Sequence, residues 1–215
     1  GSPELDKKSG INTGRLSGIS NHHVPAYLRT NQLPSYDTNC IDEWEQKVDK
    51  IIDETIDQPM GLISGIPPWV QMYFDRIQAR TGKKIKDVFP EFSLFVYGGV
   101  NFEPYREQYQ KIIPNSDFKY YEIYNASEGF FAIQDLNYSN DLLLMLDYGI
   151  FYEFIPMDTF GTPNQRIVRL ADVELFKNYA IVITTNSGLW RYMIGDTVRF
   201  TSLKPYRIRV SGRTK

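Results

Sequence analysis

Three short polar segments of this sequence interrupt or follow apolar stretches and carry the groups that could do chemistry. They are YNASEG at residues 124–129, WRYMIGD at 190–196 and SGRTK at 211–215. Together they offer hydroxyl, carboxylate and guanidinium groups, which bind polar or charged ligands. Taken singly, each is typical of a surface turn: in the first, the asparagine and the serine would bond to the local backbone and the glutamate would be solvated.

Other familiar catalytic and metal-binding patterns do not occur in the sequence. His22 and His23 are the only histidines, and with the single Cys40 far away they make a poor zinc set. There is neither a G-x-S-x-G elbow nor a histidine placed for a triad. The phosphate-loop pattern is missing, and TGKK at 81–84 is a common way to end a helix. These absences leave the three polar segments as the candidates.

The composition predicts a globular chain with a sizeable core, since 42% of its 215 residues are hydrophobic. A net charge of -2 gives no bulk attraction to nucleic acid or to anionic lipid, so neither is an expected partner. No apolar run is long enough to span a membrane. One cysteine and no signal-peptide pattern fit a reducing cytoplasm.

The first part of the chain is predicted to begin with loops and to continue with two helices. Residues 1–40 are rich in Gly, Ser, Asn and Pro, which favours loops with one short strand. Apolar residues at helical spacing predict a surface helix over 41–58. A second helix is expected to start at Pro67 and Pro68, which suit a first helical turn, and to end at Gly82.

Strands and helices then alternate over short connections. SLFVY at 93–97 predicts an apolar strand that ends in Gly98 and Gly99, where a ligand or another backbone can come close. A helix is expected over 104–113 and a further strand over 119–124. This alternation is typical of an α/β fold, a mixed sheet flanked by helices.

The character changes to strands separated by turns after the first polar segment. We therefore expect a helix-and-sheet half at 1–129 and an antiparallel, barrel-like β half at 130–210. No helix of any length is predicted in the second half. The expected strands are FFAIQD, LLLMLD, IFYEFI, YAIVITT, LWRYMI, TVRF and YRIRV.

In this order, each beside a strand, the polar segments resemble the nucleotide-binding core of adenylate-forming enzymes. That pattern is Tyr-x-x-Ser/Thr-Glu, then Tyr-Arg-x-Gly-Asp, then Gly-Arg at a hinge. The intervening text is similar to the auxin-responsive acyl-acid amido synthetase family, named Gretchen Hagen in plants, and especially to its bacterial members. The resemblance covers most of residues 42–215 and rests on FVYGGVNFEPYREQY, YNASEGFFAIQD, LLLMLDYGIFYEFIPMD and LWRYMIGDTVRF.

The resemblance implies an ATP-dependent ligase that adenylates a carboxylic acid, expels pyrophosphate and passes the acyl group to an amine, expected to be that of an amino acid. Because negative charge builds on the α-phosphate, such a site needs Mg²⁺ and hydrogen-bond donors. By carry-over, Ser127 and Glu128 are the catalytic pair, with Ser127 as the donor to the phosphate. Glu128 is the Mg²⁺ ligand, and Tyr124 offers a face or edge to the adenine of ATP or AMP.

The remaining roles come from the same carry-over. Asp196, at a strand turn after a glycine, is expected to accept hydrogen bonds from the ribose hydroxyls, and Arg213 to lie near the ribose. Gly98 and Gly99 would let the nucleotide or the acyl group lie against backbone. Apolar walls of the substrate pocket are expected from Trp69, Phe130 and Phe131, for which core packing is the alternative.

The sequence also departs from the family pattern. Met193 stands where the family usually has arginine or lysine, and Arg191 is a possible substitute. The chain begins at Gly1 without Met, the phosphate-wrapping loop should lie before it, and 211–215 would start a hinge to a further domain. We therefore expect a fragment of the large N-terminal domain that is inactive alone. Two alternatives stay open: transfer to the thiol of coenzyme A, and a non-catalytic nucleotide- or ligand-binding module.

Overall fold

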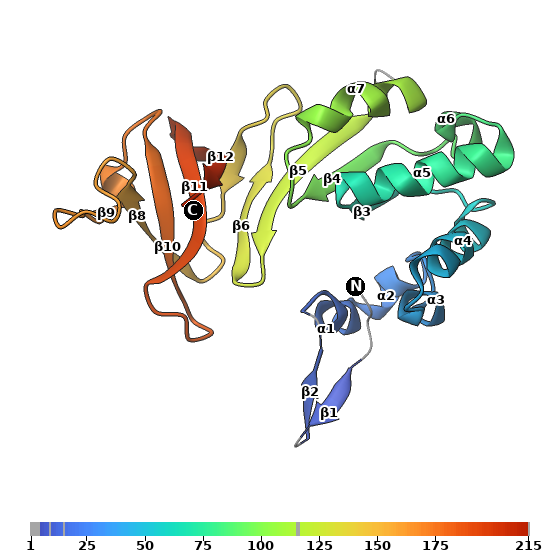
Figure 1. Ribbon diagram of the computed structural model, residues 1–215, viewed down its shortest axis with the longest axis horizontal. Helices are drawn as coiled ribbons and strands as arrows, with labels where there is room; N and C mark the ends of the chain where they lie inside the picture. The colour runs from blue at the N-terminus through green and yellow to red at the C-terminus, as the bar shows by residue number, and fades with distance from the viewer. Residues whose placement is uncertain (1–4, 9, 15, 115–116, 215) are drawn as a thin grey trace. The chain divides into compact units, whose positions relative to one another are not determined.

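The computed structural model describes residues 5–8, 10–14, 16–114 and 117–214. The chain forms two compact units (Figure 1). Unit 1 comprises residues 1–94 and 102–118, and unit 2 comprises residues 95–101 and 119–215. The division at residue 129 that we expected from the sequence stays a prediction. Among the described residues, no helix is both long enough and apolar enough to cross a bilayer.

Unit 1 is mainly helical and carries a short N-terminal hairpin. Its strands are β1 (Asp6–Lys8), β2 (Ile11–Thr13) and β3 (Leu62–Gly65). Its helices are α1 (Leu16–His22), α2 (Ala26–Arg29), α3 (Tyr36–Cys40), α4 (Trp44–Thr55), α5 (Pro67–Thr81), α6 (Ile85–Val88) and α7 (Glu103–Ile112).

The expectation of loops and one short strand at the N-terminus is wrong. β1 pairs with β2 in antiparallel fashion, and three short helices follow. These helices are too short to show an apolar period, so local capping defines their ends instead. The clearest case is α3, where the side chain of Ser35 accepts a hydrogen bond from the backbone N–H of Thr38.

The two longer predicted helices of unit 1 are confirmed. α4 is shorter than the expected range because Glu43 caps it, its carboxylate accepting from the backbone N–H groups of Glu45 and Gln46. α5 starts at Pro67 as predicted, and Gly82 ends it in a left-handed conformation with φ of 68°. One face of α5 is buried and packs the core of unit 1.

Unit 2 is built on antiparallel strands, as the sequence predicts. The strands lie in the order β4-β5-β6-β7-β12-β11-β10-β8-β9, and the described pairs from β5 onward are all antiparallel. In the described part of residues 130–214 the only helical element is a 3₁₀ turn at Leu170–Asp172. The strands are β4 (Leu94–Gly98), β5 (Lys119–Ala126), β6 (Gly129–Gln134), β7 (Leu142–Leu144), β8 (Ile150–Pro156), β9 (Val168–Arg169), β10 (Asn178–Thr185), β11 (Tyr192–Leu203) and β12 (Tyr206–Arg213).

β11 corrects the expectation of two strands separated by a turn. It runs unbroken through Gly195, whose φ is 88°. Met193 pairs with Val182 of β10 and Thr197 pairs with Ala180, so three residues of β11 lie opposite one residue of β10. This is a bulge, which locally increases strand twist and redirects side chains. Asp196 therefore projects from a bulged strand and not from a turn.

The larger buried cluster of unit 2 lies on one face of this sheet. Phe131, Phe154, Ile183 and Phe200 are among the side chains with no exposed surface there. Tyr152 lies in the same cluster, and its buried hydroxyl has no hydrogen-bond partner among the described residues. Such a rigid, aromatic core fixes the strands from which the polar segments project.

Candidate functional site

Ser127 and Glu128 form the two-residue turn of the β5–β6 hairpin. Ala126 and Gly129 pair across the turn, so the turn is held at a defined end of the sheet. Ser127 is exposed and Glu128 is half-buried. Within the described ranges, neither side chain has a hydrogen-bond or ion-pair partner, so both groups are available to a ligand.

A buried tyrosine, a carboxylate and a guanidinium meet nearby on three strands of unit 2. The hydroxyl of Tyr124 on β5 donates a hydrogen bond of 2.9 Å to Oδ2 of Asp196 on β11. Arg213 on β12 is the cross-strand partner of Asp196, and its Nη1 lies 3.5 Å from Oδ1. The structure thus brings together three residues predicted for one nucleotide site, although 72 positions separate Tyr124 from Asp196.

The bulge explains how Asp196 reaches this position. Gly195 adopts the left-handed conformation that glycine tolerates best, which turns the next side chain toward Tyr124. Thr214 secures the bulge, since its backbone N–H and its hydroxyl both donate to the carbonyl of Gly195, at 2.9 and 3.3 Å. β12 thus continues to Arg213 where a hinge was expected to begin at residue 211, and Lys215 lies outside the described residues.

Burial raises the pKa of Tyr124 well above its usual range, and the negative charge of Asp196 raises that pKa further. Tyr124 is only 8% exposed, so its phenol stays neutral in the folded protein at every ordinary pH. Burial also raises the pKa of the nearby Tyr152. Tyr124 is therefore a hydrogen-bond donor that orients the carboxylate of Asp196, not an acid that supplies protons.

We expect the stability of the chain to fall as the pH rises above about 10. In the unfolded chain a tyrosine ionises near that pH, whereas Tyr124 resists ionisation when folded. The contribution of Tyr124 to the free energy of unfolding is complete below about pH 10. Above that pH the contribution falls by about 1.4 kcal/mol per pH unit. Urea titrations between about pH 8 and pH 11 measure this. The Tyr124→Phe variant should show a shallower fall, and equal slopes for the two proteins would contradict the assignment.

The two phenylalanines that follow the hairpin have different positions. Phe131 has no exposed surface, and its ring centroid lies 5.0 Å from that of Tyr124. It is a core residue, so its predicted place on the wall of a substrate pocket is not supported by its burial. Phe130 is half-buried near Tyr148, with 5.9 Å between ring centroids, and can contact a ligand. The register shift between Tyr124 and Asn125 separates the two rings.

The two glycines at the end of β4 are required for different structural reasons. A Cβ at Gly98 would lie 2.6 Å from the carbonyl oxygen of Ile123 and 3.3 Å from Oδ1 of Asn125, so glycine is required by the close approach of β5. Gly99 has φ of 82° with open space around its Cα. The pair therefore lies beside the YNASEG segment, and only Gly99 leaves room for a ligand.

Trp69, the remaining predicted wall residue, belongs to unit 1. It lies near the start of α5, is 49% exposed and packs edge-to-face against Trp44 with 4.4 Å between ring centroids.

Arg191, considered from the sequence as a substitute for a missing cation, has a partner that the sequence did not reveal. It forms a two-pronged ion pair with Glu153 of β8, at 2.9 and 3.0 Å. Arg191 has a φ of 43°, a backbone conformation that few non-glycine residues adopt. The ion pair with Glu153 gives its side chain a defined partner. Met193 is exposed on β11, which begins directly after Arg191. The ion-pair partners are 38 positions apart in the chain, and no sequence signal links them.

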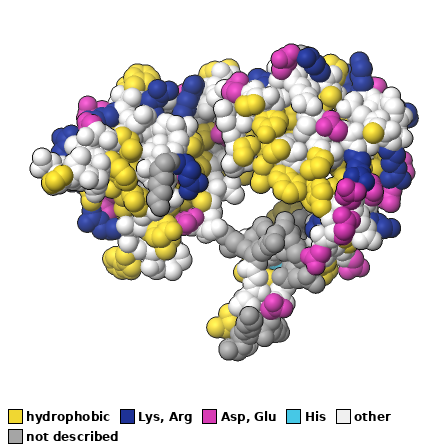
Figure 2. Space-filling model, viewed as in Figure 1, with side chains coloured by type: hydrophobic (Ala, Val, Ile, Leu, Met, Phe, Trp, Pro, Cys, Tyr) yellow, Lys and Arg dark blue, Asp and Glu magenta, His cyan; other side chains and the backbone are white. Residues whose placement is uncertain are grey.

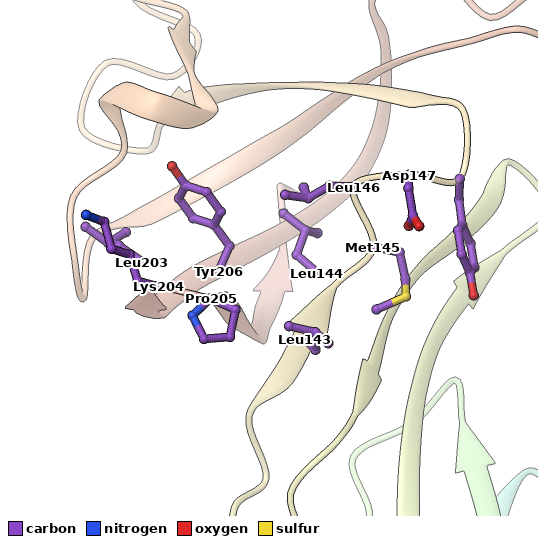
Figure 3. Close-up of a pocket in the computed structure, with 10 residues that line it drawn as sticks. Leu143, Leu144, Met145, Leu146, Asp147, Leu203, Lys204, Pro205 and Tyr206 are labelled. Carbon is purple, nitrogen blue, oxygen red and sulfur yellow. The ribbon is translucent and has the colours of Figure 1, made fainter.

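Unit 2 also has an open hollow of about 570 Å³ between the end of β7 and the β11–β12 turn (Figure 3). In Figure 3, Leu143 to Asp147 lie on one side and Leu203 to Tyr206 on the other. None of the predicted site residues lines it. The hollow is therefore separate from the Tyr124–Asp196–Arg213 cluster.

The predicted site residues could bind a Mg²⁺ ion only together with oxygen atoms from a bound ligand. Within the described ranges, no three His, Cys, Asp or Glu side chains gather closely enough to hold an ion by themselves. Mg²⁺ commonly uses one or two carboxylates together with substrate phosphates and water. The unpartnered carboxylate of Glu128 fits that mode.

The fold of the chain is that of adenylate-forming enzymes. It matches an open conformation of 2-hydroxyisobutyryl-CoA ligase in complex with 2-HIB-AMP and CoA, with a TM-score of 0.58 and 12% identity over 78% of this chain and 39% of that one. It also matches the acyl acid amido synthetase AtGH3.15 in complex with 2,4-DB, with a TM-score of 0.51 and 20% identity over 65% of this chain and 25% of that one.

The chain belongs to the GH3 family. The GH3 family N-terminal domain matches residues 2–118 and the GH3 family central domain matches residues 143–213. The indole-3-acetic acid-amido synthetase GH3.3 of Arabidopsis thaliana is 45% identical over 51 residues, which is 24% of this chain and 9% of that protein. GH3.4 of the same plant is 38% identical over 86 residues, 37% of this chain and 14% of that protein. The chain thus matches 14% or less of the length of these relatives.

Proposed function

We propose that this chain is part of an ATP-dependent ligase that adenylates a carboxylic acid and transfers the acyl group to an amine, that of an amino acid. The observation that carries the proposal is the Tyr124–Asp196–Arg213 cluster, in a chain of the GH3 family. Tyr124 lies on β5, the strand that leads into the turn with the unpartnered Ser127 and Glu128. Related synthetases are named for indole-3-acetic acid. A cytoplasmic location would supply ATP and keep Cys40 reduced.

Ser127 and Glu128 would act on the phosphate end of the nucleotide. The hydroxyl of Ser127 donates a hydrogen bond to the α-phosphate, where negative charge increases as the carboxylate attacks and pyrophosphate leaves. Glu128 would hold Mg²⁺, which would supply positive charge against the developing negative charge of the phosphate. Both residues are in the two-residue turn of the β5–β6 hairpin, which places their side chains next to each other.

Asp196 would bind the sugar end of the nucleotide. Its carboxylate is oriented by Tyr124 and Arg213, and its remaining lone pairs accept hydrogen bonds from the ribose hydroxyls. Tyr124 is too buried to stack its face on adenine, so an edge contact is the role it can take. Phe130 offers an apolar surface for the adenine base or for the acid. Because Gly99 has no side chain, the ligand can come close to the backbone there.

Transfer to coenzyme A is a second candidate for the final step, because one of the proteins of the same fold is a CoA ligase. Both reactions share the adenylation step, so they differ only in the acceptor that discharges the adenylate. Supplying the complete protein with an amino acid or with CoA, and identifying the product by mass spectrometry, separates the two. A non-catalytic binding module would release no pyrophosphate with either acceptor.

The Glu128→Gln variant of the complete protein is expected to lose acid-dependent pyrophosphate release by about 100-fold, or ~2.7 kcal/mol. A neutral amide is a poorer Mg²⁺ ligand than a carboxylate. Because Glu128 has no partner among the described residues, the melting temperature should not change. A coupled pyrophosphate assay and a thermal melt measure the two effects.

Glu91→Gln serves as the control, since Glu91 is an exposed carboxylate of unit 1. It should release pyrophosphate at the rate of the unmodified protein. Full activity of the Glu128→Gln variant would remove the metal role of Glu128.

A further inference from the structure

The hydroxyl of Tyr152 on β8 is a buried polar group that the proposed reaction does not use. The side chain of Tyr152 is 4% exposed, and its hydroxyl has no hydrogen-bond partner among the described residues. Figure 2 shows charged side chains of unit 2 at the surface, where water hydrates them, whereas this hydroxyl is buried. Buried polar groups are nearly always paired, because an unpaired one makes the folded state less stable. The hydroxyl of Tyr152 therefore needs a functional explanation.

Packing does not require a hydroxyl at this position. Tyr152 belongs to a buried cluster that also contains Phe154 and Phe200, which fill the core without a polar side-chain atom. The ring of Tyr152 is stacked on that of Phe154, with 6.4 Å between ring centroids, and a phenylalanine would make the same contact. By contrast, the hydroxyl of Tyr179 in this cluster accepts a hydrogen bond of 2.9 Å from the backbone N–H of Glu174. Tyr179 thus has the structural role that Tyr152 lacks.

Tyr152 lies close to the predicted site residues. Ile150 is two residues earlier on β8, so its side chain and that of Tyr152 lie on the same face of the strand. A Cβ at Gly129, the first residue after the β5–β6 turn, would lie 2.8 Å from Cδ1 of Ile150, so β8 runs beside this turn. Tyr124 is in the same buried cluster as Tyr152. Burial is the main cause of the raised pKa of Tyr124, and Tyr152 contributes to it after Asp196, as only a nearby group can.

The carboxylate of Asp196 can accept a further hydrogen bond. An ionised carboxylate has about four acceptor positions, and Tyr124 uses one of them on Oδ2, at 2.9 Å. Arg213 lies 3.5 Å from Oδ1, which is longer than an ordinary N–H···O hydrogen bond, and its side chain is 71% exposed to water. Burial raises the pKa of Tyr152, so its phenol stays neutral and can donate a proton to a hydrogen bond.

We propose that Tyr152 is a positioning residue of the nucleotide site, whose hydroxyl donates to the carboxylate of Asp196 when that carboxylate binds the ribose. The inference rests on the proposed function, which assigns the ribose to Asp196. The hydrogen bond of Tyr124 is part of the folded chain itself, so it contributes to stability and largely cancels in the binding free energy. A hydrogen bond that forms only with the nucleotide contributes to affinity instead. Tyr152 therefore affects affinity more than Tyr124 does.

Tyr152→Phe removes only the hydroxyl. The variant should bind AMP about tenfold more weakly, a loss of ~1.4 kcal/mol. Its urea midpoint should stay the same or rise, because no hydrogen bond of the folded chain is broken. Calorimetric titration of the 215-residue chain with AMP and urea unfolding measure the two quantities. Unchanged AMP affinity, or a lower urea midpoint, would overturn the inference.

A second nucleotide, 2′,3′-dideoxy-AMP, separates positioning of Asp196 from general damage to the site. This nucleotide lacks the ribose hydroxyls that Asp196 would bind, so Tyr152→Phe and the unmodified chain should bind it equally. If the variant loses about tenfold in affinity for both nucleotides, Tyr152 does not act through Asp196 and the inference is wrong.

Tyr179→Phe is the matched control, because it removes a buried hydroxyl of the same cluster that has a partner. It should lower the urea midpoint and leave AMP affinity unchanged. Equal losses of AMP affinity in Tyr179→Phe and Tyr152→Phe would show that Tyr152 has no specific role.

The same titrations distinguish the inference from the function on which it rests. If Asp196→Ala weakens AMP binding and Tyr152→Phe does not, the nucleotide site stands and only the role of Tyr152 is wrong. If the unmodified chain does not bind AMP, the proposed nucleotide site is wrong, and the role of Tyr152 is wrong with it.

Discussion

Replacement of Asp196 by alanine is expected to weaken AMP binding by about 100-fold, or ~2.7 kcal/mol, the largest binding effect in unit 2. Hydrogen bonds to a charged group contribute about 1.5 to 3 kcal/mol each, and the proposed role gives Asp196 the ribose hydroxyls. The change also leaves the buried hydroxyl of Tyr124 without its acceptor, which costs stability by about 1 to 3 kcal/mol. Calorimetric titration with AMP and urea unfolding measure the two losses separately.

Two further variants separate binding from stability. Asp196→Asn keeps a side-chain oxygen for Tyr124 but removes the charge, so it should remain more stable than Asp196→Ala and still bind AMP poorly. Tyr124→Phe removes the hydroxyl while Arg213 still pairs with Asp196, so AMP affinity should change by less than about threefold. If Asp196→Asn binds AMP as the unmodified chain does, Asp196 has only a structural role.

The largest loss of stability from a single added methyl group is expected for Gly98→Ala, about 2 to 3 kcal/mol. The new Cβ would lie 2.6 Å from the carbonyl oxygen of Ile123, closer than real Cβ atoms come to a neighbouring atom. Because that oxygen belongs to the backbone of β5, relief requires strands to separate rather than a side chain to rotate. Urea unfolding measures the effect.

Gly61→Ala is the matched control. Among the described residues, its Cβ would have one neighbour within 4 Å, the carbonyl oxygen of Glu91 at 4.0 Å, and its φ is not in the left-handed region. The free energy of unfolding should change by less than about 0.5 kcal/mol. Equal stability of the Gly98→Ala and Gly61→Ala variants would show that β5 tolerates a wider separation from residue 98 than the structure indicates.

The sequence predicted those parts of the fold whose causes are local. Pro67 and Gly82 define α5 because each restricts or frees its own backbone. The strands of unit 2 are predicted by the spacing of apolar side chains along the sequence alone. β11 was misread as two strands because Gly195 resembles a turn residue, and only pairing with β10 shows that it forms a bulge. Helices α1 to α3 were not predicted, because they are too short to show an apolar period in the sequence.

The candidate site was predictable as a set of residues and not as a geometry. Tyr124, Asp196 and Arg213 came from motif order, and the structure places them in one cluster. The motifs could not show that Phe131 is fully buried, since one shifted residue in the β5–β6 register decides which phenylalanine faces the core. Nor could they reveal the partner of Arg191, because contacts between distant strands depend on sheet order.

The placement of the three tryptophans gives the molecule built-in optical reporters. Trp44 and Trp69 lie edge-to-face with 4.4 Å between ring centroids, close enough for their intense far-ultraviolet transitions to couple, so we expect a dichroic band from the pair. Trp190 is 81% exposed, so we expect it to emit much as an indole in water does and its fluorescence to change little when unit 2 unfolds. Loss of the coupled band would therefore follow the melting of unit 1 alone, without any attached label.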